Sequence, residues 1–442
     1  MDERKIAVKL LYDIDKNGAY INIALEKTLN TNELQPHQKG FISELVHGVT
    51  ERKITLDYII SQFSALKLNK ISPNVLNVLR TGIYQLMFMT KVPPSAAVNE
   101  SVKIAKSFGG PRIGGFVNGV LRTVQRNSDN ISYPEDPTER LSVYYSYPLE
   151  LVKLFTDEFG LEFTEAMLIA NNTKRPLTLR CNLLKTTPDN LVKNLETEGI
   201  NAQVYHNRKF PELDYAITVD KIKNIKTLES FIKGEFYVQD VAAMLVTDVL
   251  APKPGDTVID MCAAPGGKTT HIAEKMLNKG KVYAFDIYEH KLNLINENAS
   301  RLGITICDTV LQDAAILCSE YINSADCVLV DAPCSGLGII GKKPDIKYQR
   351  KPEDFKNLSE ISLSVLNNAA QYVKKGGTLV FSTCTVMKEE NEGVIEKFLQ
   401  THGENFSLEQ IENINTCNNG YVTLYPHVDG VDGFFICKLK KH

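Results

Sequence analysis

The sequence lacks several features that would assign a chain to a broad class at once. No apolar run approaches the length of a membrane span, and residues 1–10 are charged where a signal peptide would have an apolar core. The nine cysteines are an odd number and include no C-x-x-C pair, which argues against a disulfide framework and a zinc site. We therefore expect a cytoplasmic protein with reduced thiols, no membrane attachment and no metal.

Length and charge suggest several domains of unequal character. A chain of 442 residues is too long for one ordinary core, so two or three domains are expected. Residues 1–130 contain 17 Lys and Arg against 11 Asp and Glu, whereas the remainder contains 33 against 42. A basic first domain on an acidic body permits a polyanionic partner, although an ordinary solvated surface explains the charge equally well.

The first 130 residues have the pattern of an all-α domain. Within residues 70–89, Ser72 is a candidate N-cap and Pro73 a first helical residue, and Val75, Val78 and Leu79 recur at helical spacing. The polar, proline-containing residues 127–138 predict a linker. We assign residues 1–130 to this domain and 131–174 to a helical linker.

The rest of the chain predicts two units that contain strands. Residues 175–240 alternate short strands with a helix, which indicates a small α+β unit. From residue 241 to 442, strands alternate with helices as in a doubly wound parallel sheet, and two strands at 421–426 and 433–441 predict an antiparallel pair at one edge. Five buried strands are expected at 256–263, 281–287, 308–314, 326–333 and 377–384.

The first turn of this sheet, DMCAAPGGKTT at 260–270, contains no phosphate fingerprint. A P-loop would need glycine where Cys262 stands, and G-x-G-x-x-G is missing. The pair Gly266 and Gly267 would still let the backbone approach a ligand closely. These residues favour a nucleoside without phosphate over ATP or a dinucleotide.

Acidic residues stand at the ends of four successive predicted strands: Asp260, Asp286, Asp313 and Asp331. Asp286 is placed to accept hydrogen bonds from ribose hydroxyls, and Asp313 to meet an adenine amino group, since ligands bind at the carboxyl ends of such strands. Any one of them could instead cap a helix, but four in succession are harder to explain so. S-adenosylmethionine is the favoured cofactor.

Two cysteines follow strand ends, Cys334 in DAPCSG and Cys384 in FSTCT. C5 of a pyrimidine is a poor nucleophile, but a thiolate that adds to C6 makes C5 able to attack a methyl sulfonium. A second thiol can assist release, and Asp331 is placed to hold the N3 and amino edge of the ring. These residues do not say which thiol attacks. Apolar filler is the alternative for both, and the expected role of Cys181, Cys307, Cys318, Cys327, Cys417 and Cys437.

These motifs resemble those of the RNA cytosine-C5 methyltransferases, from about residue 144 to the end of the chain. The resemblance implies a Rossmann-like class I methyltransferase domain preceded by an RNA-recognition-like unit. It also implies that Cys384 is the nucleophile, that Cys334 assists product release and that Asp331 positions the cytosine. The implied cofactor residues are Cys262, Ala263, Ala264, Pro265, Gly266, Gly267, Lys268, Asp286, Asp313 and Asp331.

The first domain is similar to the helical RNA-binding fold of the antitermination factor NusB, through residues 92–124. Joined to a cytosine-C5 methyltransferase, it resembles a group of bacterial enzymes that act on one cytosine of 16S ribosomal RNA, at position 967 in the usual numbering. A monomer that binds protein-poor 16S RNA is therefore expected. Candidate phosphate contacts, or alternatively a solvated helix face, are Lys103, Lys106, Arg112 and Arg122.

Two other functions stay open. The chain could be an RNA-binding assembly or antitermination factor with a catalytically silent sheet, although the intact thiols and glycine loop argue against it. It could also apply the same chemistry to another ribosomal or transfer RNA cytosine.

Overall fold

The computed structural model describes residues 2–18, 21–31, 34–220, 222, 224–414 and 419–442. Contacts divide the chain into two units. The helical unit comprises Met1–Asn172 together with Lys342–Gln349, and the sheet unit comprises Thr173–Gly341 together with Arg350–His442. None of the described helices combines the length and apolarity that crossing a bilayer requires.

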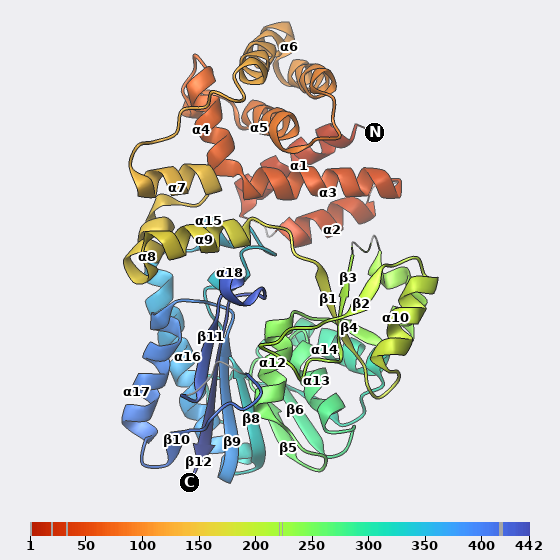
Figure 1. Ribbon diagram of the computed structural model, residues 1–442, viewed down its shortest axis with the longest axis vertical. Helices are drawn as coiled ribbons and strands as arrows, with labels where there is room; N and C mark the ends of the chain where they lie inside the picture. Colours follow the sequence, from red (N-terminus) through yellow and green to blue (C-terminus); the bar gives the residue numbers. More distant parts are fainter. Residues whose placement is uncertain (1, 19–20, 32–33, 221, 223, 415–418) are drawn as a thin grey trace. The chain divides into compact units, whose positions relative to one another are not determined.

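The helical unit confirms the expected all-α fold of the first domain (Figure 1). Asp2 caps its first helix by accepting from the backbone N–H groups of Arg4 and Lys5. Ser72 stands at the N-cap position of α5 and Pro73 is its first residue, as expected, although the Ser72 side chain makes no capping hydrogen bond. Its helices are α1 (Glu3–Asn17), α2 (Ile21–Thr31), α3 (Pro36–Glu51), α4 (Lys53–Phe63), η1 (Leu68–Lys70), α5 (Pro73–Phe88), α6 (Pro94–Arg126), α7 (Pro137–Tyr145), α8 (Leu149–Phe159), α9 (Leu161–Asn171) and α15 (Ile346–Gln349).

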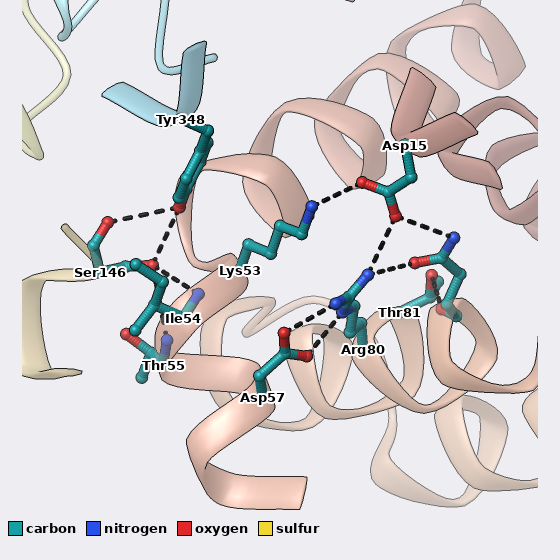
Figure 2. A network of polar contacts seen from close by, with 10 residues as sticks. Asp15, Lys53, Ile54, Thr55, Asp57, Arg80, Thr81, Ser146 and Tyr348 are labelled. Atoms are coloured by element: carbon teal, nitrogen blue, oxygen red, sulfur yellow. Dashed lines mark hydrogen bonds and ion pairs between the residues drawn. The ribbon is translucent and has the colours of Figure 1, made fainter. Parts of the chain in front are cut away.

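The last of these helices comes from a distant part of the sequence. Lys342–Gln349 leaves the sheet unit and packs into the helical unit, where the Tyr348 hydroxyl lies 3.2 Å from Ser146 Oγ. Ser146 Oγ in turn accepts from the Ile54 backbone N–H at 2.9 Å (Figure 2). Lys347 is fully buried and donates to the Glu51 carbonyl oxygen at 2.8 Å. The segment is therefore part of the core of the helical unit.

The sheet unit begins with a small antiparallel sheet in the order β2-β3-β1-β4. Its elements follow the βαββαβ sequence of a ferredoxin-like fold, which confirms the expected α+β unit. They are β1 (Leu177–Cys181), α10 (Pro188–Thr197), β2 (Ala202–Val204), β3 (Ala216–Val219), η2 (Ile225–Thr227), α11 (Glu229–Ile232) and β4 (Phe236–Val238). Thr187 caps α10, and Pro188 is its first residue, as the sequence predicts.

The second sheet has the order β10-β12-β9-β8-β5-β6-β7, with β11 also paired to β12. Strands β5 to β9 pair in parallel, and β12 runs antiparallel to β9. The strands are β5 (Thr257–Asp260), β6 (Lys281–Asp286), β7 (Cys307–Leu311), β8 (Ala325–Asp331), β9 (Val373–Thr383), β10 (Phe406–Leu408), β11 (Tyr421–Leu424) and β12 (Phe434–Lys441). The five expected strands and the antiparallel pair are thus confirmed (Figure 1).

The helices around this sheet complete a doubly wound α/β fold. They are α12 (Val241–Leu250), α13 (Gly267–Lys275), α14 (Glu289–Leu302), α16 (Pro352–Tyr372), α17 (Glu392–His402) and α18 (Pro426–Asp429), with short turns η3 (Ser319–Tyr321), η4 (Leu337–Ile339) and η5 (Lys388–Glu390). One expectation is wrong: β7 is not buried, because it is an edge strand whose residues are half-buried or exposed.

The strand order reverses at β5, which has β6 on one side and β8 on the other. Such a reversal opens a crevice at the carboxyl ends of the strands, where doubly wound folds bind ligands. One hydrophobic core joins the two sheets, since Leu179 of β1, Leu245 of α12 and Val258 of β5 belong to the same cluster. The small sheet is therefore fixed to β5, the strand at which the order reverses.

Candidate active site

The loop between β5 and α13 carries Cys262–Lys268, the predicted cofactor residues. Ala263 N donates to the Phe285 carbonyl oxygen at 2.8 Å, which fastens the loop to the end of β6. Gly266 has a φ of +96°, in the left-handed region that strains any side chain. A Cβ on Gly267 would lie 3.0 Å from the ring of Tyr237. The glycine pair thus provides a tight entry into α13 beside β4.

The second predicted cofactor acid, Asp286, ends β6 beside this loop. Its Oδ2 accepts from Ala264 N at 3.3 Å and its Oδ1 from Tyr288 N at 3.1 Å. Asp313 lies two residues beyond β7, where its Oδ1 accepts from Ala315 N at 2.9 Å. Both carboxylates stabilise turns, and both stand at the carboxyl ends of parallel strands on one side of β5, namely β6, which pairs with β5, and β7, which pairs with β6. Asp286 and Asp313 can therefore stabilise these turns and still present a carboxylate oxygen to a ligand.

The acid at the end of β5, Asp260, has a different environment. It is buried, and its Oδ2 accepts from Thr269 Oγ1 in α13 at 2.7 Å. Burial raises the pKa of Asp260 to about 7, and the nearby Asp331 carboxylate adds to the rise. Asp260 braces α13 against the sheet, so we assign it no ligand.

Asp331, predicted to hold a cytosine, ends β8 in an ion pair with the last residue of the cofactor loop. Lys268 Nζ lies 2.6 Å from Asp331 Oδ2, and Ser382 Oγ donates to Asp331 Oδ1 at 2.9 Å. Burial acts to lower the pKa of Lys268, but the charge and hydrogen bond of Asp331 outweigh it and the pKa is raised. Lys268 therefore stays charged and couples the loop to the acid, a pairing that sequence reasoning missed.

The two predicted cysteines come together although fifty residues separate them. Cys334 Sγ and Cys384 Sγ are 3.2 Å apart, and Cys384 N donates to Cys334 Sγ at 3.3 Å. Cys334 follows β8 and Cys384 follows β9, and these strands are parallel neighbours. Adjacent parallel strands end at the same edge of a sheet, which is why both thiols meet next to Asp331.

Both the contact between the thiols and burial act on the pKa of Cys334. The hydrogen bond to Cys384 is the largest effect on Cys334, and with burial it raises the pKa of Cys334 well above its ordinary value. Cys334 thus holds its proton and can donate it to the sulfur of Cys384. The backbone N–H of Cys384, which donates to Cys334 Sγ, acts in the opposite direction on the pKa of Cys334.

A buried carboxylate joins the loops that carry these thiols. Glu390 accepts from Ser335, which follows Cys334, and from Thr385, which follows Cys384. Sequence reasoning did not single out Glu390. The acidic stretch KEENE at 388–392, directly after the second cysteine motif, was the signal available.

The second residue missed is Arg180 of β1, which is fully buried. It donates to Glu274 of α13 at 2.9 and 3.0 Å, to Thr270 Oγ1 at 3.0 Å and to the Gly267 carbonyl oxygen at 2.6 Å. A further short hydrogen bond joins it to Gln239. Arg180 therefore fastens the small sheet to the helix that follows the cofactor loop.

The remaining cysteines differ in burial. Cys181, Cys327 and Cys437 are buried, in agreement with the expected apolar filler, whereas Cys307 and Cys318 are half-buried. Cys262 of the cofactor loop is a free thiol whose pKa burial raises. Cys417 lies outside the described residues.

The residues at this edge fit a cofactor without phosphate. Asp286, Asp313 and Asp331 follow or end three strands of the sheet, and the cation of the loop, Lys268, is paired with Asp331. Such a set suits hydroxyl and amino donors and a positively charged group, and would repel a pyrophosphate.

Comparison with families of known proteins covers most of the chain. The model of the family described as 16S rRNA methyltransferase RsmB/F matches residues 247–440. The NusB family matches residues 1–126, and the ferredoxin-like domain of the RsmF/B-like methyltransferases matches residues 147–225. These matches agree with the three folds predicted from the sequence.

Individual proteins are similar over the whole length. "Probable ribosomal RNA small subunit methyltransferase B" of Bacillus subtilis is 41% identical over 446 residues, which cover 99% of this chain and 98% of that protein. The crystal structure of the protein PH0851 matches with a TM-score of 0.82 and 26% identity, over 100% of this chain and 99% of that one. NSun6 of Pyrococcus horikoshii, crystallised with an analogue of S-adenosylmethionine, matches with a TM-score of 0.58 and 25% identity, over 70% and 98%.

Proposed function

Since the chain belongs to the RsmB/F family of ribosomal RNA methyltransferases, which use S-adenosylmethionine, we propose that it methylates C5 of one cytosine in 16S ribosomal RNA through a covalent bond to Cys384. The observation that carries this proposal is the contact of two thiols, 3.2 Å apart, beside the Asp331–Lys268 pair. A redox or structural thiol pair would not need an acid and the cofactor loop at the same edge of the sheet.

The cofactor would be held by the loop Cys262–Lys268 and the acids beyond the neighbouring strands. Asp286 would accept from the ribose hydroxyls, and Asp313 from the adenine amino group. S-adenosylmethionine, when bound, supplies an electrophilic methyl group. Because Lys268 pairs with Asp331, ordering of the loop by the cofactor would also order the acid that meets the base.

The residues on the other side of the crevice would activate the base. Cys384 as thiolate adds to C6 of the cytosine while Asp331 holds the N3 and amino edge, so that electron density moves to C5. C5 takes the methyl group as the cofactor sulfur departs as a neutral thioether. The C5 proton passes to a water molecule, and the C5–C6 double bond re-forms as the bond from Cys384 to C6 breaks. Cys334, whose pKa is raised, would return a proton to the leaving sulfur of Cys384 across their 3.2 Å contact.

The target base must leave any stack to reach Cys384, so a loop or protein-poor RNA is the expected substrate. By the resemblance of the whole chain we propose the cytosine at position 967. The candidate phosphate contacts Lys103, Lys106, Arg112 and Arg122 are all exposed on α6, as contact with an RNA backbone requires.

Covalent trapping tests the proposed chemistry. Wild type, Cys334→Ala and Cys384→Ala would each be mixed with protein-free 16S RNA and S-adenosylmethionine and separated on a denaturing gel. We expect Cys334→Ala to accumulate a protein–RNA adduct and Cys384→Ala to form none and to transfer no methyl group. Cys318→Ala is a matched control, because Cys318 is a half-buried thiol outside this contact and its loss should leave transfer unchanged.

Two outcomes would redirect the assignment. If the wild type transfers no methyl group to 16S RNA but does so to another RNA, the substrate is wrong and the chemistry stands. If no tested RNA is methylated and neither thiol variant gives an adduct, the chain acts as an RNA-binding assembly factor.

A further inference from the structure

The two thiols are carried by loops that no strand pairing holds together. We define the first thiol loop as residues 332–338, after β8, and the second thiol loop as residues 384–387, after β9. Strand pairing between β8 and β9 reaches only Asp331 and Ser382. Beyond the strand ends, Gly338 N of the first loop donates to the Cys384 carbonyl oxygen of the second at 2.9 Å. This bond lies four residues from Cys334, so a thiol-to-thiol distance of 3.2 Å needs a further contact next to Cys334.

A single carboxylate provides contacts to both loops. Glu390, at the end of η5, is 1% exposed. Its Oε1 accepts from the Ser335 backbone N–H at 2.7 Å, and its Oε2 accepts from Ser335 Oγ at 2.6 Å and Thr385 Oγ1 at 3.0 Å. Ser335 Oγ and Thr385 Oγ1 are themselves 2.9 Å apart. The three side chains thus form a closed triangle directly behind Cys334 and Cys384.

Asn391, the residue after Glu390, forms hydrogen bonds with the residues on both sides of Cys384. Asn391 is fully buried, and its Oδ1 accepts from Thr383 Oγ1 at 2.5 Å while its Nδ2 donates to the Thr385 carbonyl oxygen at 3.1 Å. Thr383 and Thr385 are the two neighbours of Cys384. The backbone that carries this thiol is therefore held before and after it.

Burying Glu390 carries an electrostatic penalty that packing alone would not require. Burial raises the pKa of Glu390, and the hydrogen bonds from Ser335 act in the opposite direction. Its partners are a backbone N–H and two hydroxyl groups, so Oε1 is satisfied by the first thiol loop and Oε2 by both thiol loops. Because all the hydrogen bonds of this buried acid go to the two thiol loops, it holds one loop in a defined position relative to the other.

We propose that Glu390 is a positioning residue that sets the distance between Cys334 and Cys384, acting through Ser335 and Thr385. This inference deepens the proposed function and rests on it for its catalytic consequence, because proton donation from Cys334 to Cys384 requires the two sulfurs in contact. Glu390 itself is not a catalytic residue. It acts on the reaction only through the loops.

The test measures the geometry of the thiols independently of RNA. Oxidised glutathione converts two thiols in contact into a disulfide, releasing two molecules of reduced glutathione, and the reaction demands closely defined sulfur positions. Mass spectrometry of peptides would give the rate at which the Cys334–Cys384 disulfide forms. The variants are Glu390→Ala, which removes all the acceptors, and Glu390→Gln, which keeps the shape and one carbonyl oxygen. Glu389→Gln is the matched control, since Glu389 is adjacent and exposed.

We expect disulfide formation in Glu390→Ala to slow at least about tenfold, with Glu390→Gln intermediate and Glu389→Gln equal to wild type. Methyl transfer by Glu390→Ala should fall about a hundredfold in kcat while the affinity for S-adenosylmethionine changes little, because a small misplacement of reacting groups has effects of that size. A merely structural role would weaken cofactor binding and kcat together and would not be recovered by Glu390→Gln.

A folded Glu390→Ala protein that forms the disulfide at the wild-type rate would overturn the proposal. If Glu390→Ala does not fold, Ser335→Ala and Thr385→Val decide, since each removes one hydroxyl of the triangle; unchanged rates in both would also overturn it. The disulfide arm needs neither RNA nor methyl transfer. Failure of the proposed function therefore leaves this result interpretable.

Discussion

Two buried arginines, one in each unit, perform different tasks with the same chemistry. Arg80 of α5 donates to both carboxylate oxygens of Asp57, each at 2.7 Å, and to Asp15 at 3.0 Å (Figure 2). Arg180 of β1 donates to both oxygens of Glu274, at 2.9 and 3.0 Å. Each is a forked guanidinium on a carboxylate, the arrangement in which arginine binds most strongly.

The environments of the carboxylates separate the two cases. The side chains of Asp57 and Asp15 are 23% and 31% exposed, whereas that of Glu274 is 5% exposed. Water can therefore replace Arg80 at its partners but not Arg180 at Glu274. Arg180 also holds the Gly267 carbonyl oxygen at the end of the cofactor loop. The arginine–carboxylate contact thus joins helices in the helical unit. In the sheet unit it supports the helix that follows the loop of the candidate active site.

The largest effect is expected from Arg180→Met. It leaves the carboxylate of Glu274 buried without its cation, which typically costs about 3 to 5 kcal/mol of unfolding free energy. Burial already raises the pKa of Glu274, with Arg180 opposing the rise. Urea unfolding, followed by hydrogen exchange of peptides from α13, measures the change, and binding of S-adenosylmethionine should weaken because Gly267 loses its anchor.

The double variant Arg180→Met, Glu274→Gln separates the two contributions. Removing the unpaired charge should recover most of the stability but not the cofactor affinity, since Gly267 stays without a donor. If the double variant recovered both the unfolding free energy and the affinity for S-adenosylmethionine, the only role of Arg180 would be to neutralise the charge of Glu274.

A smaller loss is expected from Arg80→Met, about 1 to 3 kcal/mol, because the freed aspartates can be hydrated. Hydrogen exchange should report the loss in peptides of α4 and α5 and leave those of α13 unchanged, and binding of S-adenosylmethionine should stay at the wild-type level. A loss equal to that of Arg180→Met would contradict the distinction drawn from exposure.

The smallest effect concerns a third buried cation, Lys347, which has no carboxylate contact of this kind. It donates to the Glu51 carbonyl oxygen and lies over the ring of Tyr147. Burial lowers its pKa to about 7. The unfolded chain keeps the ordinary higher pKa and so binds more protons above pH 7, which means that stability rises with pH in this window.

We expect the unfolding free energy of the helical unit to rise by about 1 kcal/mol from pH 7 to pH 8 through this residue. Lys347→Met should remove that rise and stabilise the unit more at pH 7 than at pH 8. Parallel urea titrations of wild type and variant at the two pH values give the difference. An identical pH dependence in both proteins would mean that Lys347 stays charged when folded.

Local sequence signals were sufficient for much of the fold. Ser72 with Pro73 and Thr187 with Pro188 mark helix starts by rules that depend only on neighbouring residues. The alternation of strands and helices fixed the class of the larger sheet, and its strand ends located Asp286, Asp313 and Asp331. The burial of β7 was mispredicted because the local pattern of a strand does not say whether it lies inside the sheet or at its edge.

The contacts that complete the site were beyond local signals. Glu390 reaches Ser335 across 55 residues, and Arg180 reaches Glu274 across 94. A buried polar residue and an exposed one look alike in a single sequence, since only the folded chain shows what surrounds them. The roles of Cys384 and Cys334 came from the resemblance, and the structure brings the two thiols into contact.

The packing of Lys342–Gln349 into the helical unit has a consequence for how the protein is made. Synthesis runs from the N-terminus, so residues 1–172 emerge long before the piece that fills their core. The contacts of Tyr147 with Lys347 and of Ser146 with Tyr348 can form only after Lys342–Gln349 has been synthesised. By then the ribosome has already made more than half of the sheet unit. The helical unit therefore cannot finish folding before synthesis of the sheet unit begins. Its last segment is made while the sheet unit is still being synthesised.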